Sequence, residues 1–301
     1  MSEDDDAAVG KLCCASCGIA EVDDIKLKEC DDCDLVKYCS DECEQDDKSH
    51  HKKACKERAA ELRDEILFKQ PESSHRGDCP ICCLPVPLDA EKSIIQTCCS
   101  EIICKGCDHA NKMREIEGKL SFKCPFCRRP VPREKRFRDK QRMKRLEVND
   151  PVAMRYKGKD LCKKGEYDSA FGYLMKADHL GDVDAQYSLA GMYRKGHGVE
   201  KDEGMEMYHL EEAAIGGHPF ARHNLGVHEW NNDNEERAVK HWIIAATQGD
   251  DGSIKALMLA FRRGLISKEE FAAALRANQA AVDATKSPQR EAAEEFYRNA
   301  V

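Results

Sequence analysis

The chain has 301 residues, a length that predicts about two domains, and its formal net charge is −8 at pH 7. All but one of its 18 cysteines lie before residue 128, so the two ends of the chain differ in chemistry. Because nucleic acids select positive charge, an acidic chain of this kind is not expected to bind them in general.

No apolar run in the sequence approaches the roughly 18 residues of a transmembrane helix, so we expect no membrane contact. The start of the chain, residues 1–12, is acidic, does not resemble a signal peptide and is expected to be disordered. We therefore expect an intracellular protein, cytoplasmic rather than nuclear. In a reducing compartment its clustered cysteines would bind metal instead of forming disulfides.

Residues 13–56 contain four closely spaced pairs of possible metal ligands. In a Cys-x2-Cys pair the backbone folds back so that both sulfurs reach one Zn²⁺ at about 2.3 Å. A segment this short cannot bury enough core to fold alone, and structural zinc, which contributes about 10–16 kcal/mol in finger peptides, would supply the difference. The pairs are Cys14 with Cys17, Cys30 with Cys33, Cys39 with Cys43, and His51 with Cys55.

The run KYCSDEC followed by HKKAC resembles a MYND-type zinc finger, with Tyr38 in the family's aromatic position. The resemblance implies a module that docks peptides rather than one that reads DNA. Lys48 stands where the family commonly has a groove tryptophan, and Cys13 and His50 remain alternatives to neighbouring ligands. The family's cross-brace implies two sets of zinc ligands, Cys14, Cys17, Cys39 and Cys43 in one and Cys30, Cys33, His51 and Cys55 in the other.

Residues 57–75 are expected to form a helical linker. The stretch has helical composition, with Leu62, Ile66 and Leu67 at helical spacing, and Pro71 ends the pattern.

Residues 76–132 contain three further Cys-x2-Cys pairs and a Cys-Cys doublet, enough for two closed zinc sites. The order of pair, doublet, pair and pair resembles an all-cysteine RING-type zinc finger. Cys83 remains an alternative to Cys98 as a ligand. In the family at least one residue usually separates the third and fourth ligands, whereas Cys98 and Cys99 are adjacent here. The cross-brace of the family implies Cys79, Cys82, Cys104 and Cys107 for one zinc and Cys98, Cys99, Cys124 and Cys127 for the other.

The RING resemblance implies an E3 ubiquitin ligase that holds a ubiquitin-charged E2 enzyme. Asn111 stands where many members have a tryptophan that contacts the E2 enzyme. Two of the apolar residues implied as E2 contacts, Ile81 and Pro125, could instead serve to pack the finger. A helix is expected over residues 108–119. The E2 contacts that the resemblance implies are Ile81, Pro125, Phe126 and Arg128.

Residues 133–149 are expected to form a basic connector between domains. Ten lysines and arginines lie between Arg128 and Arg145. Such a run could also be a nuclear-import or nucleic-acid patch. Since Phe137 is the one aromatic residue in it, a stacking surface for single strands is not favoured.

Residues 150–285 repeat. Aligning LGDVDAQYSLA, GGHPFARHNLG and QGDDGSIKALM places Gly181, Gly217 and Gly249 in register, which is typical of a helical-hairpin solenoid. The copy A-x3-L-x3-Y-x2-GHGV-x2-D resembles a Sel1-like repeat, a family that binds proteins. Its Gly196 and Gly198 suit a turn with positive φ. Residues 286–301 are expected to form a C-terminal helix.

The sequence thus predicts a multi-domain protein: two small cross-braced α+β zinc domains, then an all-α Sel1/TPR-like solenoid. Four structural zinc ions are expected, and no residue is assigned a catalytic role. The leading hypothesis is a RING-type E3 ligase whose partners are an E2 enzyme and, through the repeats, a protein substrate or adaptor. A non-enzymatic scaffold that only binds proteins remains the alternative.

Overall fold

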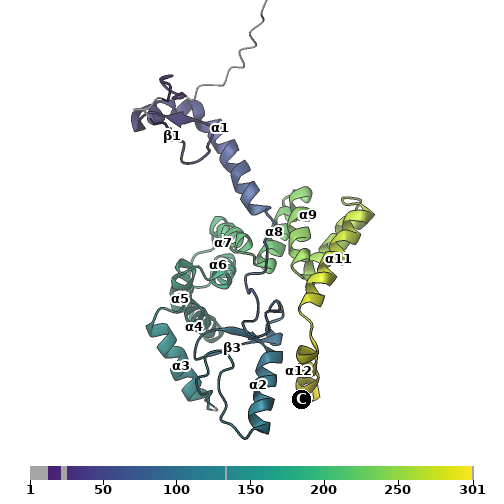
Figure 1. Cartoon of the computed structure of the whole chain (residues 1–301). Coiled ribbons are helices and arrows are strands. Elements are labelled where there is room, and N and C mark those ends of the chain that lie inside the picture. The colour runs from purple at the N-terminus through teal and green to yellow at the C-terminus, as the bar shows by residue number, and fades with distance from the viewer. Residues whose placement is uncertain (1–12, 22–25, 133, 300–301) are drawn as a thin grey trace, which may run out of the picture. The chain divides into compact units, whose positions relative to one another are not determined.

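The computed structural model describes residues 13–21, 26–132 and 134–299 (Figure 1). The predicted disorder of residues 1–12 lies outside this range. Two compact units make up the chain, one ending at Lys69 and the other beginning at Gln70. None of the described helices is both long and apolar enough to cross a membrane.

The first unit consists of a short hairpin and one long helix. Strands β1 (Lys28–Glu29) and β2 (Lys37–Tyr38) pair antiparallel and precede helix α1 (Asp41–Leu67). The Ser40 side chain caps α1 by accepting a hydrogen bond from the backbone of Cys43. Cysteine side chains form most of the small core, which shows how little apolar area this unit has to bury. Of the helical linker expected over residues 57–75, residues 57–67 are the end of α1, which continues without a break from the finger, and residues 68–75 are not helical.

The second unit begins with a small finger of similar design. Helix η1 (Ala90–Lys92) leads into β3 (Ser93–Ile95), which pairs antiparallel with β4 (Ile102–Cys104). Helix α2 (Lys105–Glu117) follows at once, because the Cys104 sulfur accepts a hydrogen bond from the backbone of Cys107 and caps the helix. The helix expected over residues 108–119 therefore begins three residues earlier.

The basic segment forms helix α3 (Lys135–Glu147), which has no buried residue. Gln141 ties it to the finger through a 2.7 Å hydrogen bond with the hydroxyl of Thr97. Arg142 lies 3.6 Å from Asp139 and 3.9 Å from Asp160, a residue of the next helix. Part of the positive charge is thus paired within the chain.

Eight helices then stack as four antiparallel pairs, a helical solenoid (Figure 1). Small buried alanines such as Ala170, Ala213 and Ala245 allow the helices to approach closely. The bounds are α4 (Pro151–Lys164), α5 (Tyr167–His179), α6 (Val183–Lys195), α7 (Glu203–Ile215), α8 (Pro219–Asn231), α9 (Glu235–Thr247), α10 (Asp251–Arg262) and α11 (Lys268–Ala284).

The repeat register reflects one local motif at the start of each pair. Gly181, Gly217 and Gly249 all have positive φ, and Asn149 with φ 56° takes the same place before the first pair. The next residue caps the following helix: an aspartate in three pairs, and His218 in the third pair along the chain. The glycines align because each pair must reverse the chain and cap a new helix at once.

The last described helix, α12 (Pro288–Asn299), packs on α2 of the finger rather than extending the solenoid (Figure 1). The finger and the solenoid are therefore joined at both ends of the unit.

Gly198 offers a test of the turn between α6 and α7. A Cβ added to it would lie 2.5 Å from the backbone of Tyr167, whereas one added to Gly181 would meet nothing within 4 Å. Since both residues have positive φ, each change to alanine costs about 1 kcal/mol from the backbone. We expect Gly198→Ala to lose about 2 kcal/mol more than Gly181→Ala. Both tryptophans lie in α8 and α9, so urea unfolding followed by tryptophan fluorescence reports on the solenoid. Equal losses would contradict this account.

Candidate metal centres

Sixteen side chains converge in four groups of four. Within each group the ligand atoms all lie within 4.8 Å of one another. The first unit holds two groups and the finger of the second unit holds two. Their members are Cys14, Cys17, Cys39 and Cys43; Cys30, Cys33, His51 and Cys55; Cys79, Cys82, Cys104 and Cys107; and Cys98, Cys99, Cys124 and Cys127. These are the same sets that the two family resemblances imply.

The spacing within the groups fits a tetrahedral metal ion. Two sulfurs bound at about 2.3 Å with tetrahedral angles lie about 3.8 Å apart, whereas a disulfide brings them to about 2.05 Å. The sulfurs of Cys30 and Cys55 are 3.8 Å apart, and so are those of Cys82 and Cys104. The donor sets, four cysteines or three cysteines and a histidine, are those of closed structural zinc sites.

The pKa values of the cysteines also favour metal binding by these groups. Burial is the main cause that raises the pKa of Cys55 and Cys107 to about 12, and nearby thiols add to it, although the hydrogen bond with Cys104 opposes the rise at Cys107. Hydrogen bonding from Cys104 and from backbone N–H groups outweighs burial at Cys79 and lowers its pKa to about 4. One thiol of a group can thus ionise readily while its neighbours resist, because like charges so close repel. A dication such as Zn²⁺ removes that penalty.

The same backbone turn recurs at four Cys-x2-Cys pairs. In each, the residue after the second cysteine has positive φ: Gly18 (75°), Asp34 (52°), Cys83 (55°) and Arg128 (61°). In the second finger the amides of Cys83 and Arg128 bond back to the carbonyl of the first cysteine, at 2.8 and 3.0 Å. The turn aims both sulfurs at one point, and this explains the spacing of the motif.

Cys83 therefore occupies the place that Gly18 has in the first finger. Its side chain is exposed and belongs to none of the four groups. The structure instead brings Cys98 to the second site. A tight turn makes adjacent ligands possible there: the Ser100 amide bonds to the Gln96 carbonyl at 2.8 Å, with Ser100 at φ 64°. Cys13 is exposed and also lies outside the groups.

The four residues implied as E2 contacts lie on the two matching turns of the second finger. Ile81 and Phe126, each between two ligands, are 41% and 44% exposed, and Pro125 is half-buried. Arg128 is exposed and donates from Nη1 to Oδ1 of Asn111 at 3.2 Å. We call Ile81, Pro125, Phe126 and Arg128 the shelf.

The contact of α12 with the first zinc group of this finger is absent from the sequence predictions. Arg290 is 5% exposed and donates from Nη2 to the Cys82 sulfur at 3.3 Å and to the Leu84 carbonyl at 3.0 Å. Gly106 lets it approach, since a Cβ there would lie 2.8 Å from the Arg290 side chain. A guanidinium beside a ligand sulfur stabilises the thiolate form that binds metal. Nothing in the local sequence around Arg290 marks it as a neighbour of a zinc site.

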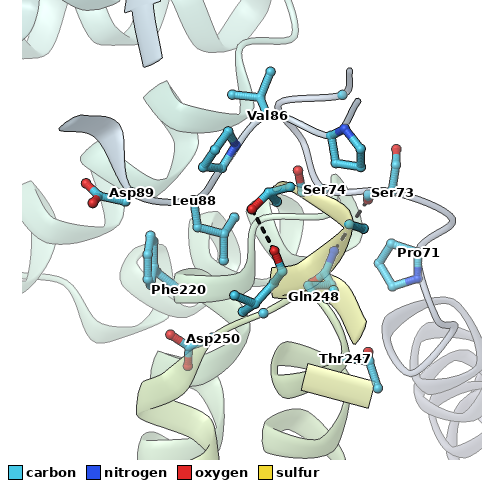
Figure 2. Close-up of a pocket in the computed structure, with 18 of the residues that line it drawn as sticks. Pro71, Ser73, Ser74, Val86, Leu88, Asp89, Phe220, Thr247, Gln248 and Asp250 are labelled. Atoms are coloured by element: carbon cyan, nitrogen blue, oxygen red, sulfur yellow. Dashed lines mark hydrogen bonds between the residues drawn. The ribbon is translucent and has the colours of Figure 1, made fainter. Parts of the chain in front are cut away.

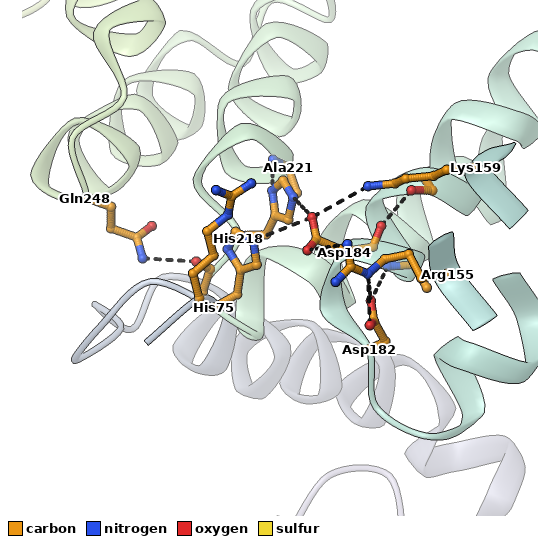
Figure 3. Close-up of polar contacts among 12 residues, drawn as sticks. His75, Arg155, Lys159, Asp182, Asp184, His218, Ala221 and Gln248 are labelled. Carbon is orange, nitrogen blue, oxygen red and sulfur yellow. Dashed lines mark hydrogen bonds and ion pairs between the residues drawn. The ribbon is translucent and has the colours of Figure 1, made fainter. Parts of the chain in front are cut away.

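A fifth group, formed by His75, Asp184 and His218, lies where the segment before the second finger meets the solenoid (Figure 3). The His75 and His218 side chains are 4% and 2% exposed, and each Nε2 lies 3.7 Å from Oδ1 of Asp184. The two imidazoles stack with centroids 4.3 Å apart, and Tyr187 stacks on His218 at the same separation.

This fifth group does not fit a metal ion. Nδ1 of His218 accepts the amide proton of Ala221 at 3.2 Å, so in the neutral ring the proton sits on Nε2, the atom that faces Asp184. Arg155 also lies 3.1 Å from Oδ2 of Asp184, and Lys159 lies 3.9 Å from Oδ1. The negative charge of the Asp184 carboxylate is thus already balanced by these two cations. We interpret the group as a buried polar contact that fastens the finger to the solenoid.

Comparison with known proteins supports part of this assignment. Residues 14–55 match the family model described as MYND finger, which confirms a zinc-binding finger of this type in the first unit. A comparison with curated proteins finds no match.

The solved structures that resemble the chain include two repeat proteins. A Sel1 repeat protein from Oxalobacter formigenes is 22% identical with a TM-score of 0.44, and the match covers 57% of this chain and 51% of that one. A protective antigen of uropathogenic Escherichia coli strains with an SLR fold is 20% identical with a TM-score of 0.40, over 55% of this chain and 37% of that one. This chain thus aligns with only about half of the first structure and less of the second.

Cys98 and Cys83 form a matched pair for testing the ligand assignment. We expect Cys98→Ser to reduce bound zinc from about four ions per chain to about three, because it removes one donor of a closed site. Cys83→Ser removes only an exposed thiol and should leave the zinc content unchanged. Elemental analysis of the purified monomer measures both. The opposite pattern would make Cys83 the ligand.

The buried histidines make solenoid stability depend on pH. Burial lowers the pKa of His218 to about 4, from about 6.5 in the unfolded chain. Between these values the unfolded state binds a proton that the folded state does not. The stabilisation is therefore complete above pH 6.5 or so and decreases as the pH falls toward about 4.

His218→Asn keeps a helix-capping side chain but removes this titration. On going from about pH 7 to about pH 5, we expect the variant to lose up to about 2 kcal/mol less than the wild type. Urea unfolding followed by tryptophan fluorescence measures the difference. Parallel pH profiles would mean that His218 is not the group responsible.

Proposed function

We propose that this protein is a RING-type E3 ubiquitin ligase. In this proposal the second finger recruits a ubiquitin-charged E2 enzyme. The MYND finger and the helix pairs, which we take to be Sel1-like repeats, bind substrate or adaptor proteins. The observation that carries the proposal is the shelf: Ile81 and Phe126 stand 41% and 44% exposed on paired zinc turns, with Arg128 exposed beside them.

Zinc in such a finger would fix the backbone and take no part in the reaction, because all four positions of each ion are filled by protein ligands. The finger contributes no nucleophile. Its effect would come from position, since it holds the E2 thioester in a geometry that favours attack by a substrate lysine. Ile81 and Phe126 suit this role because metal ligands on either side hold their backbone still while the side chains face outward.

The packing of α12 leaves the shelf open. Within α2, α12 contacts Gly106 and His109, and the His109 ring lies 4.7 Å from that of Phe296. Asn111, which reaches Arg128, is two residues on from His109 and so faces the other side of the helix. One side of α2 can therefore contact α12 while its other side, next to the shelf, remains accessible to a partner protein.

A non-enzymatic scaffold is the second candidate, and Asn111 favours it. Its amide donates to the Lys123 carbonyl at 3.0 Å, and its oxygen accepts from Arg114 at 2.9 Å as well as from Arg128. An asparagine engaged in this way has little to offer an E2 surface, where many RING domains present a tryptophan. The two candidates differ in whether the finger discharges a charged E2.

Ile81 provides the sharpest test. If the shelf binds an E2, Ile81→Ala should remove a central apolar anchor at a cost of about 2 kcal/mol, or about 30-fold in affinity. Zinc content and thermal stability should stay nearly unchanged, because the side chain is exposed. Leu180→Ala removes a similarly exposed side chain on the solenoid and serves as the control. Loss of stability without loss of E2 binding would place Ile81 in the packing of the finger.

A substitution at Arg128 tests whether E2 binding and ubiquitin transfer depend on different residues of the shelf. We expect Arg128→Gly to slow ubiquitin discharge from the E2 more than it weakens E2 binding. Glycine also relieves the positive φ of 61°, so the fold should not suffer. Single-turnover discharge assays across a broad panel of E2 enzymes measure the effect. If the wild-type protein discharges none of them, the scaffold is the correct function.

A further inference from the structure

A cleft of about 700 Å³ opens between the second finger and the solenoid (Figure 2). One wall comes from residues 70–74, 77–78 and 85–89 and from Lys92, which lie on either side of Cys79 and Cys82 in the chain. The other comes from residues 247–252, at the turn into α10, and from the last turn of α11. We call this space the junction cleft. Its volume falls within the range of about 300–1,000 Å³ found for ligand sites.

The walls of the junction cleft are partly apolar. Pro71 and Leu88 belong to the wall formed by the finger segments, and Phe220, in α8, belongs to the wall formed by the solenoid (Figure 2). Phe220 is 37% exposed although it is a large apolar residue. The side-chain amide of Gln248 donates to the Ser73 carbonyl at 3.4 Å and to the Gly217 carbonyl at 3.2 Å, so it fastens the two walls together. The cleft is thus bounded by parts that are hydrogen-bonded to each other.

The charge around the junction cleft is strongly one-sided. Its single basic residue, Lys92, lies 2.9 Å from Glu294 and is thereby neutralised. Four of its five acidic residues are exposed, and no ion pair of the described residues involves them, whereas the buried Asp250 lies 3.3 Å from His223. The carboxylates that line the cleft are Glu72, Asp78, Asp89, Asp250 and Asp251.

These features narrow the choice of occupant. Excess negative charge disfavours a phosphate backbone or an anionic membrane surface. A divalent cation is not favoured either, since none of the metal-capable groups among the described residues includes a carboxylate of the cleft. Partly apolar walls with exposed carboxylates at the rim instead suit a side chain with an aliphatic stem and a positive end, as in lysine and arginine.

We propose that the junction cleft binds a basic segment of a protein partner, an extended peptide with lysine or arginine beside small apolar residues. The aliphatic stems and apolar residues would cover Leu88 and Phe220, and the charged ends would reach the carboxylates of the rim. The inference deepens the proposed function, since a segment held there is bound to the unit that carries the shelf. Only its role as a ligase substrate depends on that function.

The test uses the full-length, zinc-loaded protein and a phage-displayed library of random peptides. We expect selected peptides to contain lysine or arginine next to apolar residues. In the combined variant Glu72→Gln, Asp78→Asn and Asp251→Asn, their affinity by fluorescence anisotropy should fall about tenfold. Phe220→Ala should weaken the same peptides without changing the charge.

The matched control neutralises three exposed carboxylates elsewhere, Glu147, Glu200 and Glu269, each changed to glutamine. It should leave affinity unchanged, because the local rim and not the net charge attracts the peptide. Selected peptides without basic residues, or equal binding by both triple variants, would overturn the inference. Peptide binding needs neither E2 nor ubiquitin, so the result is independent of the ubiquitin-discharge assays.

Discussion

Repulsion between clustered thiolates is the constraint on which both fingers depend. Each group holds three or four sulfurs at separations that no covalent bond explains, and burial makes ionisation harder still. The fingers bury few apolar side chains other than cysteine, so we expect their folded state to be stable only when a dication converts this repulsion into attraction. The four similar turns, each with a residue of positive φ, are the local geometry that this requirement imposes.

The second finger also depends on the solenoid. His75, which precedes the finger in the chain, stacks on His218, the residue that caps α8. Arg290 of α12, which follows the repeats, donates to the sulfur of Cys82 in the finger. These contacts fix where the shelf lies relative to the repeats. A partner protein bound to the repeats would therefore be presented to the shelf in one orientation, without an interdomain hinge within this unit.

Features set by local chemistry could be predicted from the sequence. The Cys-x2-Cys spacing brings its two sulfurs together wherever it occurs, and Gly181, Gly217 and Gly249 mark the chain reversals because little else tolerates their φ. At two equivalent positions of the repeats the sequence did not predict the turn or the cap, because the residue type changes there while the geometry stays the same. Asn149 replaces a glycine, and His218 replaces a capping aspartate.

Contacts between distant segments could not be predicted in this way. Gln289 bonds to the Gly106 carbonyl across 183 residues, and the amphipathic pattern of α12 shows only that it has a buried face, not what covers it. The junction cleft is hidden for the same reason, because its walls come from stretches with no shared motif. Nothing in the sequence relates Glu72 to Asp251, and only the fold brings both to the lining of one cleft.

The position of α12 bears on how the protein is made. A ribosome completes the second finger long before it reaches Arg290, so the nascent finger emerges with one face of α2 bare. Until the last helix arrives, the thiolate of Cys82 lacks its guanidinium neighbour and the finger holds zinc without that support. Maturation of this metal site would then end only after the repeats have been synthesised, and a ribosome that stalls within them would leave the finger open to chaperones.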